Sequence, residues 1–390
     1  MKNLYSLLSV FTFVFLLSFN SLFAQAPVVD DVNSYTTQGT KIVDGTVVVT
    51  VTFSEPVTVT GTPTITLETG SSDVVVDFTG FNEGSSGAQL NFTYTVEEGH
   101  TTAGARLDYV STTALSGTIK SAAAPFEDAT LTLATPGDSN SLSDNKNFVI
   151  DGVSPTMTIA STTSGVTDGS TTNDASIALT FTSSEATTNF VVGDISVTNG
   201  ALSSFAGSGK NYTATFTATA DGATTIDVIA GKFTDAYGNQ NDASNTYNWI
   251  QDDTSPTGAI TYSAASPYKQ NATATVTATF TEALTTTPKI AISGVSSVAA
   301  TNMTSTGSAN IWTYAYTAPA GNGTDTFAFS VGTDAYGNVV TAAPTSGATV
   351  TVDNTAPIIS AVTQVSTPSN DTTPSYVFTT DEAGTITTNI

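Results

Sequence analysis

The sequence predicts an all-β protein made of tandem seven-stranded antiparallel β-sandwich domains arranged as an extended string. Three observations support this prediction: a linker motif that recurs at a fixed spacing, apolar residues at every second position within each repeat, and a composition rich in Thr, Ser, Val, Ala and Gly. Because good helix formers are scarce, we expect helix to be nearly absent.

The chain begins with a segment typical of a secretory signal peptide. Lys2 supplies a positive charge, residues 4–19 are apolar, and Ala24 stands at an expected cleavage point before Gln25. An apolar run of about 16 residues is short for a membrane-spanning helix, which needs roughly 20. We therefore expect residues 1–24 to be removed on export. The mature chain is expected to be secreted or held at the cell surface, without a membrane span.

The composition excludes several classes of function. The chain carries 9 basic and 33 acidic residues, a net charge of −24, so it should repel nucleic-acid phosphates. Cysteine is absent and His100 is the only histidine, which argues against zinc and copper sites. His100 lies in the turn EEGHTT and is expected to be a solvated turn residue rather than a catalytic base.

A repeat sets the domain organisation. Three linkers read alike: DGVSPT from Asp151, DDTSPT from Asp252 and DNTAPI from Asp353. Their prolines lie 101 residues apart, which is about the length of one β-sandwich domain. After each linker, a strand-like run ends in an acidic residue, and the first unit has the same feature. These acidic residues are Glu55, Glu185, Glu282 and Glu382.

Alternation within each unit predicts half-buried strands. The runs LNFTYTV (90–96), YTATFTA (212–218) and WTYAYTA (312–318) place large apolar residues at every second position. We expect Trp249 and Trp312 to pack in cores. In the second unit this pattern predicts strands at 156–162, 175–185, 194–198, 201–206, 211–219, 223–230 and 245–251.

These signals predict the following division: a signal peptide at 1–24, domains at 30–150, 151–251 and 252–352, and the start of a fourth domain at 353–390. The fourth segment has fewer than 40 residues, enough for two strands of a fold that needs seven. We expect it to be a truncated domain of a longer protein.

The segment VTVTFSEPVTVTGTPTITLETG (49–70), together with the recurring frame of linker proline, acidic strand end and TDAYGN, resembles bacterial immunoglobulin-like (Ig-like) repeats. Such repeats occur in tandem in secreted and cell-surface proteins, many of them adhesins. The resemblance covers roughly residues 30–390. It implies Ig-like sandwiches that serve as a stalk or binding module, often stiffened by calcium. The first unit departs from the pattern because it has APFEDATLTL in place of the DAYGN string.

Acidic residues are expected to meet at one pole of each unit. In this topology the start of the first strand, the end of the second and the loop before the last strand share that pole. The predicted sets are Asp151, Glu185, Asp235 and Asn239 for the second unit, and Asp252, Asp253, Glu282, Asp334 and Asn338 for the third. The first unit offers Asp30, Asp31, Glu55, Glu127 and Asp128.

Two interpretations of these sets are open. Carboxylates that meet at 4 Å repel by about 4 kcal/mol per pair at an effective dielectric constant near 20, and a bound cation would relieve this. Calcium prefers six to eight oxygen ligands of this kind, and a calcium ion at each junction would turn a flexible string into a rod. Alternatively, Asp, Gly and Asn are ordinary turn residues, and the repeat copies a turn.

Two classes of function remain. The first is a non-catalytic structural or adhesive repeat protein whose cell, matrix or polysaccharide ligand the sequence does not name. The second is a set of accessory modules, such as carbohydrate-binding modules, of a secreted enzyme whose catalytic domain is missing from this chain. Glu97 and Glu98 are adjacent and should point apart, so we expect them to increase solubility rather than to catalyse.

Overall fold

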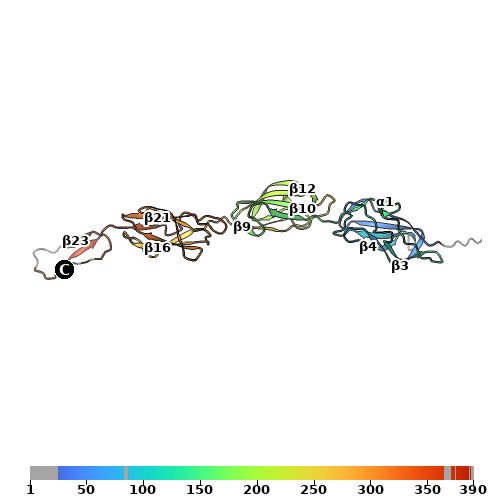
Figure 1. Cartoon of the computed structure of the whole chain (residues 1–390). Helices are drawn as coiled ribbons and strands as arrows, with labels where there is room; N and C mark the ends of the chain where they lie inside the picture. The colour runs from blue at the N-terminus through green and yellow to red at the C-terminus, as the bar shows by residue number, and fades with distance from the viewer. Residues whose placement is uncertain (1–24, 83–86, 364–369, 374, 386, 388–390) are drawn as a thin grey trace, which may run out of the picture.

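The computed structural model describes residues 25–82, 87–363, 370–373, 375–385 and 387. It shows three β-sandwiches that follow one another end to end, and then a small two-stranded sheet (Figure 1). The predicted signal peptide lies outside the described residues. Within the described part, no helix has the length and apolar character needed to cross a bilayer.

The first sandwich is organised around one long strand. Strand β3 pairs through its first half with β1 and β5, and through its second half with β4 and β6. A second, two-stranded sheet joins β2 to β7 in parallel. The elements are β1 (Val29–Ser34), β2 (Gly39–Lys41), β3 (Thr46–Leu67), β4 (Val74–Phe81), β5 (Gly87–Thr95), β6 (Leu115–Ser121), α1 (Leu142–Asn145) and β7 (Phe148–Ile150).

The second sandwich has seven strands in two sheets, ordered β12-β10-β8 and β11-β13-β14-β9. The elements are β8 (Met157–Ser161), β9 (Ser170–Thr172), β10 (Ser176–Thr187), the 3-10 helix η1 (Val192–Asp194), β11 (Ser196–Thr198), β12 (Gly200–Ala218), β13 (Gly222–Asp227) and β14 (Tyr247–Gln251). The sequence pattern missed β9, a three-residue strand that pairs in parallel with β14.

Strand β12 contains two of the predicted strands. The chain folds back within β12, where Gly207 and Gly209 have positive φ angles of 138° and 64°. A Cβ atom at Gly207 would lie 2.3 Å from the carbonyl oxygen of Asn211, so the two arms of the hairpin approach too closely there for any other residue.

The third sandwich has eight strands in two four-stranded sheets, ordered β15-β16-β20-β19 and β18-β17-β21-β22. The elements are β15 (Gly258–Tyr262), β16 (Thr273–Phe280), β17 (Lys289–Ser293), β18 (Val298–Asn302), β19 (Thr304–Ser305), β20 (Ile311–Thr317), β21 (Gly323–Ser330) and β22 (Thr349–Val352). This is one strand more than the seven expected, and the additional strand is the two-residue β19. After it, β23 (Ile359–Thr363) and β24 (Val377–Thr380) form an antiparallel pair.

Each sandwich has its own core, built from the apolar residues that alternate along the strands. Trp249 is fully buried and Trp312 is 8 % exposed, as the alternation predicted. Helix is limited, among the described residues, to the four residues of α1 and the three of η1. The fold is therefore the predicted all-β string of tandem sandwiches, with the parallel pairs β2–β7 and β9–β14 as departures from a purely antiparallel order.

Candidate cation sites at the sandwich joints

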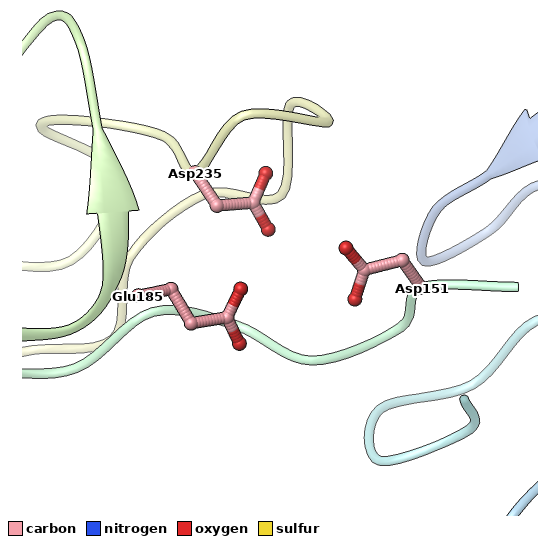
Figure 2. Close-up of side chains that lie close together, drawn as sticks. All are labelled: Asp151, Glu185 and Asp235. Carbon is pink, nitrogen blue, oxygen red and sulfur yellow. The ribbon is translucent and has the colours of Figure 1, made fainter. Parts of the chain in front are cut away.

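Three acidic side chains from distant parts of the chain meet between the first and second sandwiches. Asp151 follows β7 directly, Glu185 lies near the end of β10, and Asp235 belongs to the loop between β13 and β14. Figure 2 shows their carboxylates directed toward a common space. One carboxylate oxygen from each residue lies within 4.8 Å of the other two.

The joint between the second and third sandwiches repeats this arrangement. Asp252 follows β14, Glu282 comes two residues after β16, and Asp334 lies in the loop between β21 and β22. Their carboxylate oxygens also lie within 4.8 Å of one another. Asp253, which the sequence placed in the same set, is not part of this group among the described residues.

The loop that contains Asp-Ala-Tyr-Gly-Asn folds around its aspartate. Oδ1 of Asp235 accepts backbone hydrogen bonds from Tyr237, Gly238 and Asn239 at 2.8, 2.7 and 3.0 Å. Gly238 has a φ of 108°, which explains the glycine in the string. Asp334 accepts the same three bonds in its own loop. The loop's own backbone thus satisfies Oδ1 of each aspartate, while the carboxylate as a whole lies close to the other two acids of its joint.

The asparagine that ends the string connects the two sandwiches. Nδ2 of Asn239 donates to the backbone oxygen of Asp151 and to Oδ2 of Asp235, both at 2.8 Å, and Oδ1 accepts from the backbone of Val43 in the first sandwich at 3.2 Å. Nδ2 of Asn338 donates to the backbone of Asp252 and to Oδ2 of Asp334 in the same way. In this arrangement the amide nitrogens, not the amide oxygens, face the acids.

The linkers themselves are hydrogen-bonded on both sides. The backbone nitrogens of Asp151 and Asp252 donate to Lys41 and Thr172 of the preceding sandwich at 2.9 and 3.0 Å. In each linker, the proline stands four residues after this aspartate. Its carbonyl oxygen accepts a hydrogen bond from a backbone nitrogen of the following sandwich. The joints therefore continue the sheet hydrogen bonding, and the linker acids occupy fixed positions.

A second recurring contact was not predicted. Glu98 accepts from the backbone nitrogen and the hydroxyl of Ser154 at 2.9 and 2.7 Å, which corrects its interpretation as a merely solubilising residue. Asp221 of the second sandwich accepts hydrogen bonds from the backbone nitrogen of Asp253 and from the hydroxyl of Thr254. Asn322 accepts from the backbone of Asn354. Each of the three residues stands directly before a glycine, which is the signal that could have revealed them.

His100 also belongs to this first joint. Its Nδ1 accepts from the backbone nitrogen of Glu97 at 3.0 Å and lies 3.1 Å from the hydroxyl of Tyr94, on whose ring it stacks. Its backbone oxygen accepts from Gly152 in the linker. His100 is therefore packed against Tyr94 and hydrogen-bonded to the linker, which corrects its interpretation as a solvated turn residue.

The negative charges of the two clusters are only partly compensated by neighbouring groups. Burial raises the pKa of Glu185, and the charges of Asp151 and Asp235 raise it further, while Lys210 opposes them. Burial also raises the pKa of Asp151 and of Glu282, with added repulsion from their acidic neighbours. Burial acts in the same direction on Asp334, but the hydrogen bonds from Asn338, Tyr336 and Gly337 outweigh it and lower its pKa.

The donor set suits a hard cation. Two ligands on opposite sides of a calcium ion lie about 4.6–5.2 Å apart, so carboxylate oxygens within 4.8 Å of one another can share one ion. Three carboxylates leave room for backbone oxygens and water in a shell of six to eight ligands. The pole of the first sandwich differs: Asp31 is bonded to Asn33 and Asn145, and Asp128 pairs with Lys120 at 2.7 Å.

Residues 151–250 match the family model of the bacterial Ig-like domain. The second sandwich is a bacterial Ig-like domain. The match begins at Asp151, so this Ig-like domain contains all three acids of the first cluster. No curated protein is significantly similar to the chain.

Several solved structures align with most of the chain at low identity. They include a tetra-tandem repeat in the extending region of a large adhesion protein (14 % identity, 87 % of this chain and 77 % of that chain, TM-score 0.28). A putative membrane anchored protein from Corynebacterium diphtheriae (12 %, 83 % and 91 %, 0.21) and invasin, a bacterial integrin-binding protein (12 %, 82 % and 59 %, 0.24), also match. These scores are too low to indicate what the chain binds.

Proposed function

We propose that this chain is a non-catalytic structural or adhesive repeat protein, exported to the cell surface or the medium, whose Ig-like string is stiffened by calcium at the joints. The observation that carries the proposal is the repetition of one three-carboxylate cluster at two successive joints. A turn copied by duplication would not require the linker acid and the strand-end acid to meet the loop acid in both places.

In this proposal each residue of the sets has a separate role. Asp151, Glu185 and Asp235 hold the ion at the first joint, and Asp252, Glu282 and Asp334 hold it at the second. Asn239 and Asn338 position the loop aspartates through their Nδ2 atoms. Each cluster takes its acids from the linker and the following sandwich, and the linker aspartate donates its backbone nitrogen to the preceding sandwich. A bound ion would therefore hold the linker in place and restrict the angle at the joint.

Calcium binding to the mature chain, residues 25–390, tests this function. We expect weak binding, with a dissociation constant of about 10⁻⁴–10⁻³ M, of the kind found in extracellular modules. At about ten times that constant, the ion should stabilise the folded state by about 1.4 kcal/mol per site. Calorimetric titration should detect the heat, and small-angle scattering should show a longer, stiffer particle than in chelator.

The double variant Glu185→Gln/Glu282→Gln should lose the calcium heat and the rise in melting temperature. A matched control, Asp73→Asn/Asp77→Asn, removes the same number of charges from exposed positions of the first sandwich and should behave as the wild type. Absence of both heat and thermal shift in the wild-type chain would refute calcium stiffening.

A further inference from the structure

The sheet face of the first sandwich that points away from the core carries a set of neutral polar side chains, of which Thr50 is itself buried. On the strands β3 and β5, Thr52 pairs with Gln89, and Thr50 pairs with Asn91. Oγ1 of Thr50 donates to Oδ1 of Asn91 at 2.9 Å. Tyr35, immediately after β1, lies over this face and reaches Gln89.

Tyr35 is exposed and at the same time held in place. Its side chain is 67 % exposed, yet its hydroxyl donates to Oε1 of Gln89 at 2.9 Å. Nδ2 of Asn82 donates to the same oxygen at 2.9 Å, and Nε2 of Gln89 lies 3.4 Å from Oγ1 of Thr52. The network fixes the ring from its polar end and leaves most of its surface to solvent. An exposed ring fixed in this way loses little side-chain entropy when a ligand covers it.

The ring borders a hollow of about 380 Å³, which is within the size range of small-molecule sites. The described residues that line it are Tyr35, Thr52, Asn82, Gly87, Ala88 and Gln89. None of these six residues is charged. A flat aromatic surface beside amides and a hydroxyl matches a sugar, whose C–H face packs on a ring and whose hydroxyls need neutral hydrogen-bond partners.

The other two sandwiches provide an internal comparison. At the positions that match Tyr35 in the strand register, the second sandwich has Thr162 and the third has Ser263. Gln89 lies opposite β3, the central strand of its sheet. The residues at the corresponding position of the second and third sandwiches are Asn211 and Ile311. The matching faces thus carry similar threonines but no aromatic ring at this place, so the set is not a general requirement of the fold.

We propose that this face of the first sandwich, formed by Tyr35, Thr52, Asn82 and Gln89, binds a neutral saccharide unit of a glycan. The charge of the chain favours a neutral ligand, because a protein with net charge −24 repels uronate- or sulfate-bearing polysaccharides. The site lies on the outer surface of the sheet, apart from the acids of the joints, so it does not depend on calcium at those joints.

Native affinity electrophoresis of the mature chain through gels containing soluble neutral polysaccharides tests the proposal. The probes are dextran, a galactomannan, xyloglucan and a yeast mannan, with alginate as the anionic comparison. We expect retardation by at least one neutral polysaccharide and none by alginate. Tyr35→Ala should weaken that binding at least about tenfold, since the ring supplies the stacking surface.

Two variants separate stacking from folding. Tyr35→Phe keeps the ring and should retain more binding than Tyr35→Ala, while Thr162→Ala, at the matching position of the second sandwich, should bind as the wild type. Because Tyr35 and Thr162 are exposed, all three variants should keep the wild-type melting temperature. The proposal is overturned if no neutral polysaccharide retards the chain, or if Tyr35→Ala is retarded as strongly as the wild type.

Discussion

Single carboxylates in this protein occur in two contrasting environments. Asp325 of β21 is fully buried, but it accepts from the backbone nitrogen and hydroxyl of Ser296 and from the hydroxyl of Tyr316. The loop acids of the joints, Asp235 and Asp334, are almost as buried and also accept hydrogen bonds, but they face other carboxylates. A buried charge persists only where it is compensated, so Asp325 is structural, whereas the mutual repulsion of the joint acids is what an added cation would relieve.

Replacing Asp325 therefore should destabilise the third sandwich. In Asp325→Ala, the backbone nitrogen of Ser296 and the hydroxyl of Tyr316 lose their acceptor inside the core, which should cost about 3 kcal/mol. Urea unfolding followed by the fluorescence of Trp312, with Trp249 replaced by Phe in both proteins, measures the change. The neighbouring exposed Thr326→Ala should change stability by less than about 0.5 kcal/mol, and a similar small effect at Asp325 would contradict this role.

At the scale of the elements, the long strand β3 depends on a local irregularity. Its pairing with β6 shifts register between Thr60 and Thr64, where Gly61 has a φ of 74° and Pro63 has no backbone donor. Opposite this bulge, Gly117 of β6 has a φ of 124°, and a Cβ atom there would lie 2.7 Å from Cα of Pro63. The bend of β3 thus requires a glycine on the neighbouring strand.

Gly117→Ala should lower the free energy of unfolding of the first sandwich by about 2 kcal/mol or more. The added methyl group would meet backbone atoms that cannot move without breaking the β3–β6 pairing. Hydrogen exchange of the β3 and β6 amides measures the loss. Gly80→Ala is the matched control: its φ is also positive, at 152°, but nothing lies within 4 Å of the added atom. Equal effects of the two substitutions would show that the contact with Pro63 is unimportant.

At the scale of the whole molecule, three sandwiches follow one another end to end (Figure 1), and a cluster of acidic side chains lies at each of the two joints between them. Glu185 and Glu282 have pKa values raised above their ordinary 4.5 by burial and by neighbouring acids. Such groups bind protons more tightly in the folded chain than in the unfolded one. Without a cation, stability should therefore increase as the pH falls from neutral toward the ordinary pKa.

In chelator, the melting temperature of the mature chain should be higher at about pH 5 than at about pH 7.5, and calcium should reduce this difference. Below about pH 4 the trend should reverse, because the lowered pKa values of Asp221 and Asp334 represent stability that is lost on their protonation. Calorimetric scans across this range, with Glu185→Gln/Glu282→Gln as the insensitive comparison, measure the effect. A melting temperature that falls steadily from pH 7.5 to 5 would contradict it.

Much of this architecture could be predicted from periodicity alone. Alternation identified the strands and the buried Trp249 and Trp312, because side chains on a strand face opposite sides regardless of what the strand contacts. The meeting of Asp151, Glu185 and Asp235 could be predicted as well, since strand order determines which chain segments share a pole.

The contacts between those segments could not be predicted and became visible only in the folded chain. Three contacts depend on turn geometry and on the reach of a side chain toward a distant part of the chain. They are the hydrogen bonds of the Asn239 amide, those between Glu98 and Ser154, and the contact of Tyr35 with Gln89. The same is true of the parallel strand β9. The repeat, the strands and the poles could be predicted from the amino-acid order, because these follow from local periodicity. The chemistry at each pole and face was decided by three-dimensional packing, which no local pattern encodes.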